Sequence, residues 1–191
     1  MPEKILILSG SPKKNGNTET LISWFCQGAK VEKAGTEVIR LNTLKFKVNG
    51  CSSCRMCQKQ KEYGCTIKDD ANAVLLKMSG ADVLVFATPL YFFSTSAQTK
   101  IIMDRMFSLY KWDNKANAME TILKGKKMVL LASAYEDIGL EALEVPFKLT
   151  ADYTGMDFES LLIKNAGVSG DIVKLSGVKE KVVEFGRKIA G

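Results

Sequence analysis

Short apolar runs alternate along the chain with segments whose apolar residues recur at helical spacing. The first run, "KILILS" at 4–9, predicts a buried strand. The next segment predicts a helix over 18–34, whose apolar face consists of Leu21, Ile22, Phe25, Cys26 and Ala29. The same pattern predicts further strands at 36–41, 81–88, 126–133 and 157–166, and further helices at 70–79, 96–110, 140–155 and 178–189. Pro146 is expected to break or restart its helix, and Gly155 to end it.

Strands and helices therefore alternate from beginning to end. The continuous apolar run "ADVLVFAT" at 81–88 implies a strand that is buried on both faces. Together these features predict an α/β fold, a doubly wound five-stranded parallel sheet with helices on both faces. We expect one domain over 1–191, with a cysteine-rich insertion at about 48–68. Ligands of such sheets bind outside the carboxyl ends of the strands, here at loops 10–18, 88–96 and 133–139.

Composition narrows the chemistry that such loops can perform. The chain has 191 residues, a net charge of +6 and no histidine, so a site must use cysteines, hydroxyls, backbone amides or a cofactor. The lysines are scattered, without a basic and aromatic stripe, and nucleic-acid binding is not expected. No apolar run approaches the roughly 20 residues of a membrane span, and no signal peptide is visible. We therefore expect a cytoplasmic protein that does not bind membranes.

The first loop, "GSPKKNGNT" at 10–18, is rich in the residues that bind phosphate. It is not a triphosphate loop, because five residues separate Gly10 from Gly16 and Asn17 stands where lysine is needed. The dinucleotide pattern also fails at positions 12 and 15. A hydroxyl-rich turn at a helix N-terminus suits one terminal monophosphate. The alternative is an ordinary turn in which Asn17 or Thr18 caps the helix.

"SGSPKKNGNT" and the later "TPLYFFSTSAQTKIIMDR" together resemble the flavodoxin-like NAD(P)H-dependent FMN reductases. The resemblance covers most of the chain and implies a flavodoxin-like fold with bound FMN. The residues implied to hold the FMN phosphate are Ser9, Ser11, Asn17 and Thr18. Those implied to border the isoalloxazine ring are Pro89, Leu90, Tyr91, Phe92 and Phe93, although Tyr91–Phe93 could instead pack in the core or a dimer. The third flavin loop of the family corresponds to Ser133, Ala134 and Tyr135.

Four of the five cysteines lie within 15 residues, in the pattern C-x2-C-x2-C-x7-C. They are Cys51, Cys54, Cys57 and Cys65. Such clustering favours metal or redox chemistry over a disulfide framework, and the first three match the start of a ferredoxin-type run. Here the resemblance narrows to the iron–sulfur flavoproteins and implies a [4Fe–4S] cluster. Bare redox or structural thiols, or zinc, remain alternatives. Cys26, on the apolar helix face, is expected to be a buried core thiol.

The function that follows is an FMN-dependent oxidoreductase in which the flavin performs the chemistry and no side chain is catalytic. FMN would be reduced by NAD(P)H or through the cluster. The implied partners are a ferredoxin-like electron protein or a small acceptor such as a quinone. A flavodoxin-like electron carrier and, less favoured, a non-redox nucleotide-binding module are the alternatives. The resemblance also implies a homodimer or homotetramer, with contacts at 88–96 and 111–118; Trp112 could equally pack locally.

Overall fold

A single five-stranded parallel sheet organises the computed structural model, which describes residues 3–113 and 118–191. The sheet has the order β2-β1-β3-β6-β7, and all four neighbouring pairs are parallel. Its strands are β1 (Lys4–Ser9), β2 (Gly35–Arg40), β3 (Val83–Pro89), β6 (Lys127–Ser133) and β7 (Asp157–Ile163). The order reverses direction between β1 and β3, as in flavodoxin-like sheets. The predicted fold class is confirmed.

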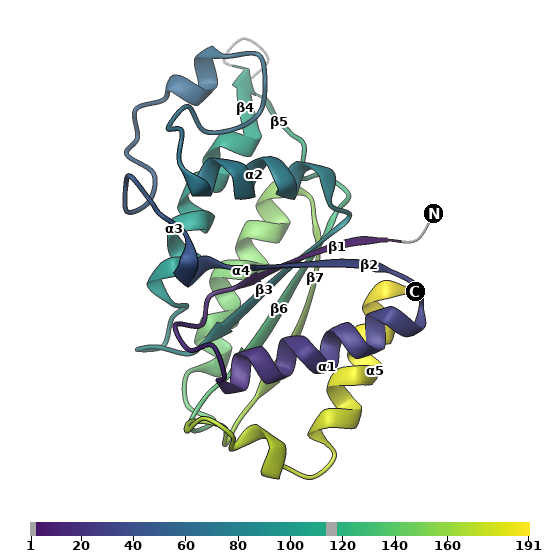
Figure 1. The fold of residues 1–191 in the computed structure, drawn as a ribbon. Coiled ribbons are helices and arrows are strands. Elements are labelled where there is room, and N and C mark those ends of the chain that lie inside the picture. The colour runs from purple at the N-terminus through teal and green to yellow at the C-terminus, as the bar shows by residue number, and fades with distance from the viewer. Residues whose placement is uncertain (1–2, 114–117) are drawn as a thin grey trace.

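Helices cover both faces of this sheet (Figure 1). One face carries α1 (Asn17–Val31) and α5 (Val178–Ala190), which lie side by side. The other face carries α2 (Asp70–Gly80), α3 (Ala97–Arg105) and α4 (Leu140–Thr154). Each strand alternates between the two cores because successive side chains point to opposite faces. Ile5 and Ile7 pack under α1 and α5, whereas Leu6 and Leu8 pack under α2, α3 and α4.

The contact between α1 and α5 depends on two glycines. A Cβ atom on Gly28 would lie 1.9 Å from the Val183 carbonyl oxygen, and one on Gly186 would lie 2.3 Å from that of Phe25. No side chain fits at either position, so the two backbones approach closely. Cys26 on α1 is only partly buried and packs against this core, where burial raises the pKa of its thiol.

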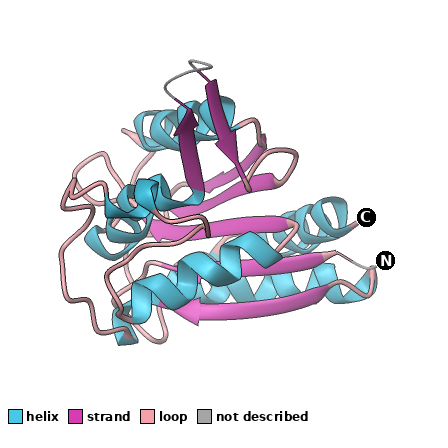
Figure 2. Cartoon of the chain, turned by 90° about the horizontal axis from the view of Figure 1, so that it is seen from above, coloured by secondary structure: helices cyan, strands magenta, loops and turns pink. Residues whose placement is uncertain are grey.

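A two-stranded antiparallel hairpin stands apart from the main sheet (Figure 2). Its strands are β4 (Tyr110–Asp113) and β5 (Ala118–Thr121). The prediction of a helix over 96–110 is wrong in its last third, since α3 ends at Arg105 and the 3₁₀ turn Met106–Leu109 leads into β4. Residues 111–113 and 118 of the predicted contact segment 111–118 belong to these strands, and residues 114–117 lie outside the described residues.

Two further predictions concern α4. Pro146 neither breaks nor restarts this helix, which runs unbroken from Leu140 to Thr154. The missing proline N–H costs one hydrogen bond, but the burial of Leu143 and Phe147 holds both turns against the sheet. Gly155 ends the helix as predicted. It adopts a left-handed conformation (φ 68°), and its N–H donates to the carbonyls of Ala151 and Asp152.

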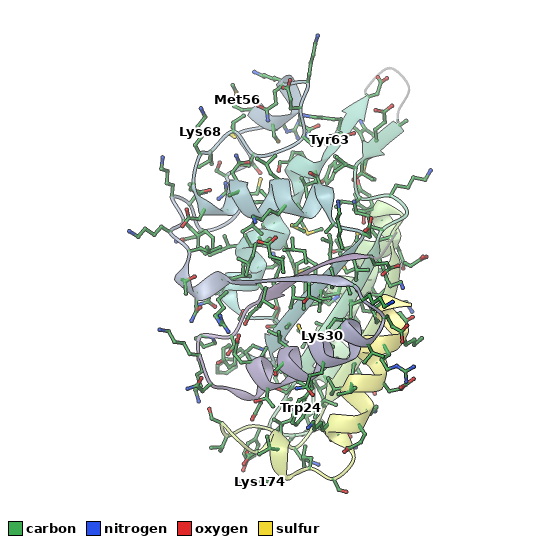
Figure 3. All side chains as sticks on the ribbon, turned by 45° about the vertical axis from the view of Figure 1, so that its right-hand side comes forward. Trp24, Lys30, Met56, Tyr63, Lys68 and Lys174 are labelled. Atoms are coloured by element: carbon green, nitrogen blue, oxygen red, sulfur yellow. The ribbon has the colours of Figure 1, made fainter. Side chains whose placement is uncertain are left out.

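The remaining strands and helices agree with prediction to within a few residues at their ends. The main irregular excursion runs from Leu41 to Asp69, between β2 and α2. It holds only two short 3₁₀ turns, Leu41–Thr43 and Met56–Lys59. Figure 3 shows Met56, Tyr63 and Lys68 of this excursion at one end of the molecule, and Trp24 and Lys174 towards the other. The excursion therefore extends at the end of the molecule away from Trp24 of α1.

Candidate functional site

Backbone hydrogen bonds join the loops at the carboxyl ends of the strands. The N–H of Gly10 donates to the carbonyl of Ala87 at 2.8 Å, and that of Leu90 to Ser133 at 3.1 Å. Ala134 N–H donates to Ile163 at 3.0 Å, and Ala166 N–H returns to Ala134 at 2.8 Å. The three loops singled out in the sequence therefore lie together, and a fourth loop at 164–172 joins them.

These loops enclose a cavity of about 200 Å³, here called the loop pocket. Nine of the predicted cofactor residues line it: Ser11, Asn17, Thr18, Pro89, Leu90, Tyr91, Ser133, Ala134 and Tyr135. Five further residues in the wall were not predicted from the sequence: Lys13, Gly16, Ala166, Gly167 and Ser169. Closed ligand pockets usually measure about 300–1,000 Å³. A flavin nucleotide would therefore lie partly outside the cavity, over the exposed rings of Tyr91 and Tyr135.

One end of the loop pocket is the N-terminus of α1. Neither Asn17 nor Thr18 caps this helix, so the alternative of an ordinary turn capped by one of these two side chains is wrong. The N-cap residue is Gly16, and in the part of the chain that the structure describes no side-chain cap accepts a hydrogen bond from the first N–H groups. These donors and the helix dipole favour an anion. The Thr18 side chain is buried in the wall, and within the described residues its hydroxyl makes no hydrogen bond. The arrangement fits a monophosphate.

Ser9 is the one predicted phosphate residue that does not line the loop pocket. Its side chain is fully buried, and its hydroxyl donates to Glu19 Oε1 at 2.5 Å. The other Glu19 oxygen accepts from Nε and from the terminal NH2 nitrogen of Arg40, both at 2.9 Å. Ser9 thus helps to fix a carboxylate in the first turn of α1, and Arg40 balances that charge.

Asn17 lines the loop pocket, but its side chain is fully occupied by protein contacts. Its amide nitrogen donates to the carbonyls of Ala166 and Val168 at 2.7 and 2.9 Å. Its amide oxygen accepts from the N–H groups of Gly170 and Ile172 at 3.0 and 3.4 Å. Asn17 therefore ties the fourth loop to α1. Only its backbone N–H remains for a ligand, which changes the role that the sequence implied.

The aromatic loop after β3 ends in a tight hairpin. Tyr91 and Ser94 exchange backbone hydrogen bonds of 2.9 and 3.0 Å, which leaves Phe92 and Phe93 at the tip. Both have positive φ, 45° and 62°, a conformation that costs bulky residues energy. Phe92 is 98% exposed, and Phe93 packs on Gly139, where a Cβ atom would lie 2.2 Å from its ring. Neither phenylalanine lines the loop pocket, so the structure does not bring these two predicted ring contacts to it.

All four clustered cysteines lie in the wall of a second, small cavity of about 20 Å³, the cysteine cavity. Cys57 is buried and Cys65 partly buried, whereas Cys51 and Cys54 are exposed. Among the described residues, no three His, Cys, Asp or Glu side chains are placed as ligands of a single metal ion. Space of this size holds about one water molecule. An iron–sulfur cluster would require the exposed side of the wall, at Cys51 and Cys54, to move outward.

The chemistry of this wall suits a sulfur-ligated anionic group. Gly50 and Arg55 of this wall adopt positive φ (123° and 53°), so the backbone turns sharply on both sides of Cys51 and Cys54. Hydrogen bonds from the Met56 N–H and the Ser52 hydroxyl lower the pKa of the Cys54 thiol. Burial raises the pKa of the Cys57 thiol, and neighbouring Cys65 adds to that effect. The buried guanidinium of Arg105 completes the wall.

The β4–β5 hairpin, which the sequence analysis missed, holds the cysteine segment (51–65) in place. Lys111 Nζ donates to the carbonyls of Cys57, Gln60 and Glu62 at 2.5, 2.9 and 2.9 Å. Gln58 donates to the carbonyls of Phe107 and Tyr110 and accepts from the Trp112 N–H. The Trp112 ring itself is 46% exposed. The period-two alternation of aromatic and charged residues in "YKWD" was the available strand signal.

A larger cavity, of about 810 Å³, lies beside the cysteine cavity rather than at the loop pocket. It is bounded by α3, α4 and the cysteine segment, with the aromatic rings of Phe107, Tyr110 and Tyr153 in its wall. Burial raises the pKa of Tyr110 to about 12. The two cavities share Cys51, Arg55 and Phe107. Size alone would select this cavity, but the helix N-terminus and the strand ends lie at the loop pocket.

Among the described residues, no helix has the length and apolar character needed to cross a membrane. Comparison with known proteins identifies a family. The model of the NADPH-dependent FMN reductases matches residues 3–156. An iron–sulfur flavoprotein of Methanocaldococcus jannaschii is 37% identical over 102 residues, which are 53% of this chain and 51% of that protein. One from Archaeoglobus fulgidus is 31% identical over 146 residues, 76% of this chain and 69% of its own.

The chain spans about half the length of most of the curated iron–sulfur flavoproteins it matches. Solved structures agree in fold. An NAD(P)H:quinone oxidoreductase from Methanothermobacter marburgensis aligns with a TM-score of 0.75 at 18% identity, over 100% of this chain and 98% of its own. An FMN-dependent NADH-azoreductase from Bacillus anthracis, in complex with FMN, aligns with a TM-score of 0.74 at 15% identity, over 98% and 100%.

Proposed function

Because the chain belongs to the NADPH-dependent FMN reductase family, and within it to the iron–sulfur flavoproteins, we propose that it is an FMN-dependent oxidoreductase. The observation that carries the proposal is the loop pocket at the point where the strand order reverses. It joins an uncapped helix N-terminus to exposed aromatic side chains. Bound FMN supplies the redox chemistry, since it accepts a hydride or two electrons and passes them on.

The residues of the loop pocket have distinct parts in this proposal. The N–H groups at the start of α1, with the hydroxyls of Ser11 and Thr18, bind the phosphate, and the nearby Lys13 adds a positive charge. Leu90 and Tyr91 border the ring on one side and Tyr135 on the other. The Tyr135 ring is fixed against the backbone, because a Cβ atom on Gly167 would lie 2.1 Å from it. No side chain is assigned to proton transfer.

The second cofactor of the proposal is an iron–sulfur cluster held by Cys51, Cys54, Cys57 and Cys65. Support comes from their common cavity, from Arg55 and Arg105 in its wall, and from the Met56 N–H that donates to Cys54. NAD(P)H is the proposed donor, and a quinone or a ferredoxin-like protein the proposed acceptor. An electron carrier with no substrate is not favoured, since the solved neighbours are named as an azoreductase and a quinone oxidoreductase.

We also propose that the chain acts in the cytoplasm as one domain and that two or more copies associate. The exposed tip at Phe92 and Phe93, beside the loop pocket, supports an interface there, because apolar side chains so placed gain from being covered. Light scattering with FMN bound tests this proposal. A monomer at micromolar concentration would contradict it.

The test of FMN binding is a titration of the apoprotein with FMN, followed by flavin fluorescence. Thr18→Val keeps the shape of the side chain but removes the hydroxyl, and weakens FMN binding by roughly tenfold, the value of one hydrogen bond to a charged group. Thr20→Val is the matched control, because Thr20 lies on the same helix turn but outside the pocket. Equal affinity in the two variants would remove the phosphate assignment.

The cluster is tested separately by anaerobic purification with iron and sulfide assays. Cys65→Ser should lose iron and sulfide but keep FMN affinity within about twofold, since the residue lies outside the loop pocket. Cys26→Ser, on α1, is the control and should keep the iron. Turnover of NADH or NADPH with a soluble quinone then completes the test. Wild-type protein with FMN and no turnover would favour the carrier.

A further inference from the structure

The guanidinium of Arg105, at the end of α3, is buried but incompletely paired. Its side chain is 1% exposed, and one terminal nitrogen donates to Asp69 Oδ2 at 2.7 Å. The other donates to the carbonyl of Ile67 at 3.1 Å. Its Nε atom is buried and has no hydrogen-bond partner among the described residues. A buried N–H without an acceptor costs about 1–3 kcal/mol, and more on a charged group.

This nitrogen belongs to the side chain that closes the cysteine cavity. Arg105 lies in the cavity wall with all four cysteines. An arginine guanidinium is charged at every physiological pH. A buried positive charge, paired with Asp69, therefore lies in the same cavity wall as Cys65. Of the groups next to it, the Cys65 sulfur is the one that becomes a strong acceptor once it is a thiolate ligand.

We propose that Arg105 positions the fourth cysteine and tunes the cluster: its Nε–H donates a hydrogen bond to the Cys65 sulfur and so makes the bound cluster easier to reduce. This inference rests on the iron–sulfur cluster of the proposed function. Hydrogen bonds to ligating sulfurs and a nearby buried positive charge both favour the more negative, reduced state of a cluster. The remaining two nitrogens hold Asp69 and Ile67, which fixes the chain immediately after Cys65.

A lysine at position 105 separates the effect of the hydrogen bond to the Cys65 sulfur from the effect of the buried positive charge. Arg105→Lys keeps a buried positive charge opposite Asp69, but it replaces the planar fork with a single nitrogen. The variant is expected to bind iron and sulfide as the wild type does, with Asp69 satisfied and the Cys65 sulfur without its donor. The matched control is Arg40→Lys, which alters a half-exposed arginine paired with Glu19 near the start of α1, outside the cysteine cavity.

The experiment is an anaerobic redox titration of the protein with its iron–sulfur cluster bound, in which EPR monitors the reduction of the cluster. The wild type and Arg40→Lys share one midpoint potential for the cluster, and the potential of Arg105→Lys shifts to a more negative value. Resonance Raman spectra add a second readout. The Fe–S(Cys) stretching bands of the wild type shift in D2O, and that shift is smaller in Arg105→Lys. An unchanged potential with unchanged isotope shifts overturns the inference.

A variant that fails to fold does not end the test, because one measurement uses only the wild type. Protein labelled with ¹⁵N at arginine Nε shows a hyperfine coupling to the reduced cluster in pulsed EPR, and Arg105→Gln, where it folds, does not. A wild type with a loaded cluster and no such coupling overturns the inference alone. A wild type that binds neither iron nor sulfide overturns both the inference and the proposed cluster.

Discussion

In the loop pocket, backbone hydrogen bonds between neighbouring strand ends set the geometry, whereas in the cysteine segment long side chains reach across to backbone carbonyls. The first arrangement follows from the parallel sheet, since Gly10, Leu90 and Ala134 all donate between adjacent loops. The second depends on Lys111, Gln58 and Arg105, which lie outside the segment or at its centre. The loop pocket is therefore a consequence of the fold, whereas the conformation of the cysteine segment depends on particular side chains.

The largest expected effect comes from the buried pair beneath the cysteine segment. Asp69→Asn removes the charge that balances Arg105, and the free energy of unfolding at pH 7 falls by about 3–5 kcal/mol. The cysteine segment should lose order while FMN affinity stays unchanged. Urea unfolding measures the loss of stability, and titration with FMN measures the affinity. A loss of FMN affinity would show that the two regions are not independent.

The same pair predicts a pH dependence. Burial alone raises the pKa of the Asp69 carboxyl, but hydrogen bonds from Arg105 and the backbone outweigh burial and lower it. A depressed pKa contributes stability that is present above the ordinary value of about 4 and is lost as the pH falls through the folded value. The difference between wild type and Asp69→Asn should therefore shrink from pH 7 to pH 3. Asp137→Asn, in an exposed pair with Lys164, should change stability by less than about 0.5 kcal/mol at either pH.

Lys111→Met tests whether the hairpin holds the cysteine segment. Three carbonyls lose their common donor, and the segment is destabilised locally by about 2 kcal/mol. Hydrogen exchange should speed up over 51–65 and stay slow in β1 and β3. Lys59→Met is the control, because Lys59 is exposed in the same segment. Equal exchange in both variants would mean that the hairpin does not hold the segment.

Asn17→Ala tests the corresponding tie at the loop pocket. FMN binding should weaken by roughly tenfold, because the loop at 164–172 loses four hydrogen bonds and about 1.4 kcal/mol of that loss appears in binding. Exchange should speed up over 166–172 and not in the cysteine segment. Asn49→Ala, at an exposed position, is the control. Weaker FMN binding without any change in hydrogen exchange would mean that Asn17 contacts the FMN phosphate directly, as the sequence implies.

The smallest effect has the opposite sign. Phe92→Asn combined with Phe93→Gly places favoured residues at the two positive-φ positions of the hairpin and should stabilise the protein by about 1 kcal/mol. The unfolding temperature would rise by about 3 °C for a chain of this size. A fall would mean that packing of Phe93 on Gly139 outweighs the relief of backbone strain. Phe92→Leu, which keeps an apolar side chain and the strain, is the control.

Most of the fold can be predicted from the sequence because hydrophobic periodicity indicates burial. Four of the main strands contain buried apolar residues, and β2 pairs with the buried strand β1. The exceptions have physical reasons. The β4–β5 hairpin consists of four-residue strands, too short for a periodic signal to stand out beside "IIMDRMFSLY". Pro146 removes one hydrogen bond, and a sequence does not show that Leu143 and Phe147 compensate through burial.

The sequence predicts which loops form the candidate site, but it does not predict the hydrogen bonds between their residues. Parallel strands bring their carboxyl ends together, so loops 10–18, 88–96 and 133–139 could be grouped from order alone. Asn17 was read as a cap or a phosphate ligand, yet its partners lie about 150 positions away along the chain. Contacts of that separation leave no local pattern. The local sequence likewise does not show that Nε of Arg105 lacks a hydrogen-bond partner among the described residues.

Helix α3 connects the loop pocket to the cysteine cavity. Its N-cap, Ser96, contacts the first loop, because a Cβ atom on Gly10 would lie 2.7 Å from the Ser96 hydroxyl. Its last residue is Arg105, in the wall of the cysteine cavity. Nine helical residues measure about 13.5 Å. The length of α3 thus sets the distance between the loop pocket and the cysteine cavity, and one inserted residue would turn the guanidinium by about 100° away from the cavity wall.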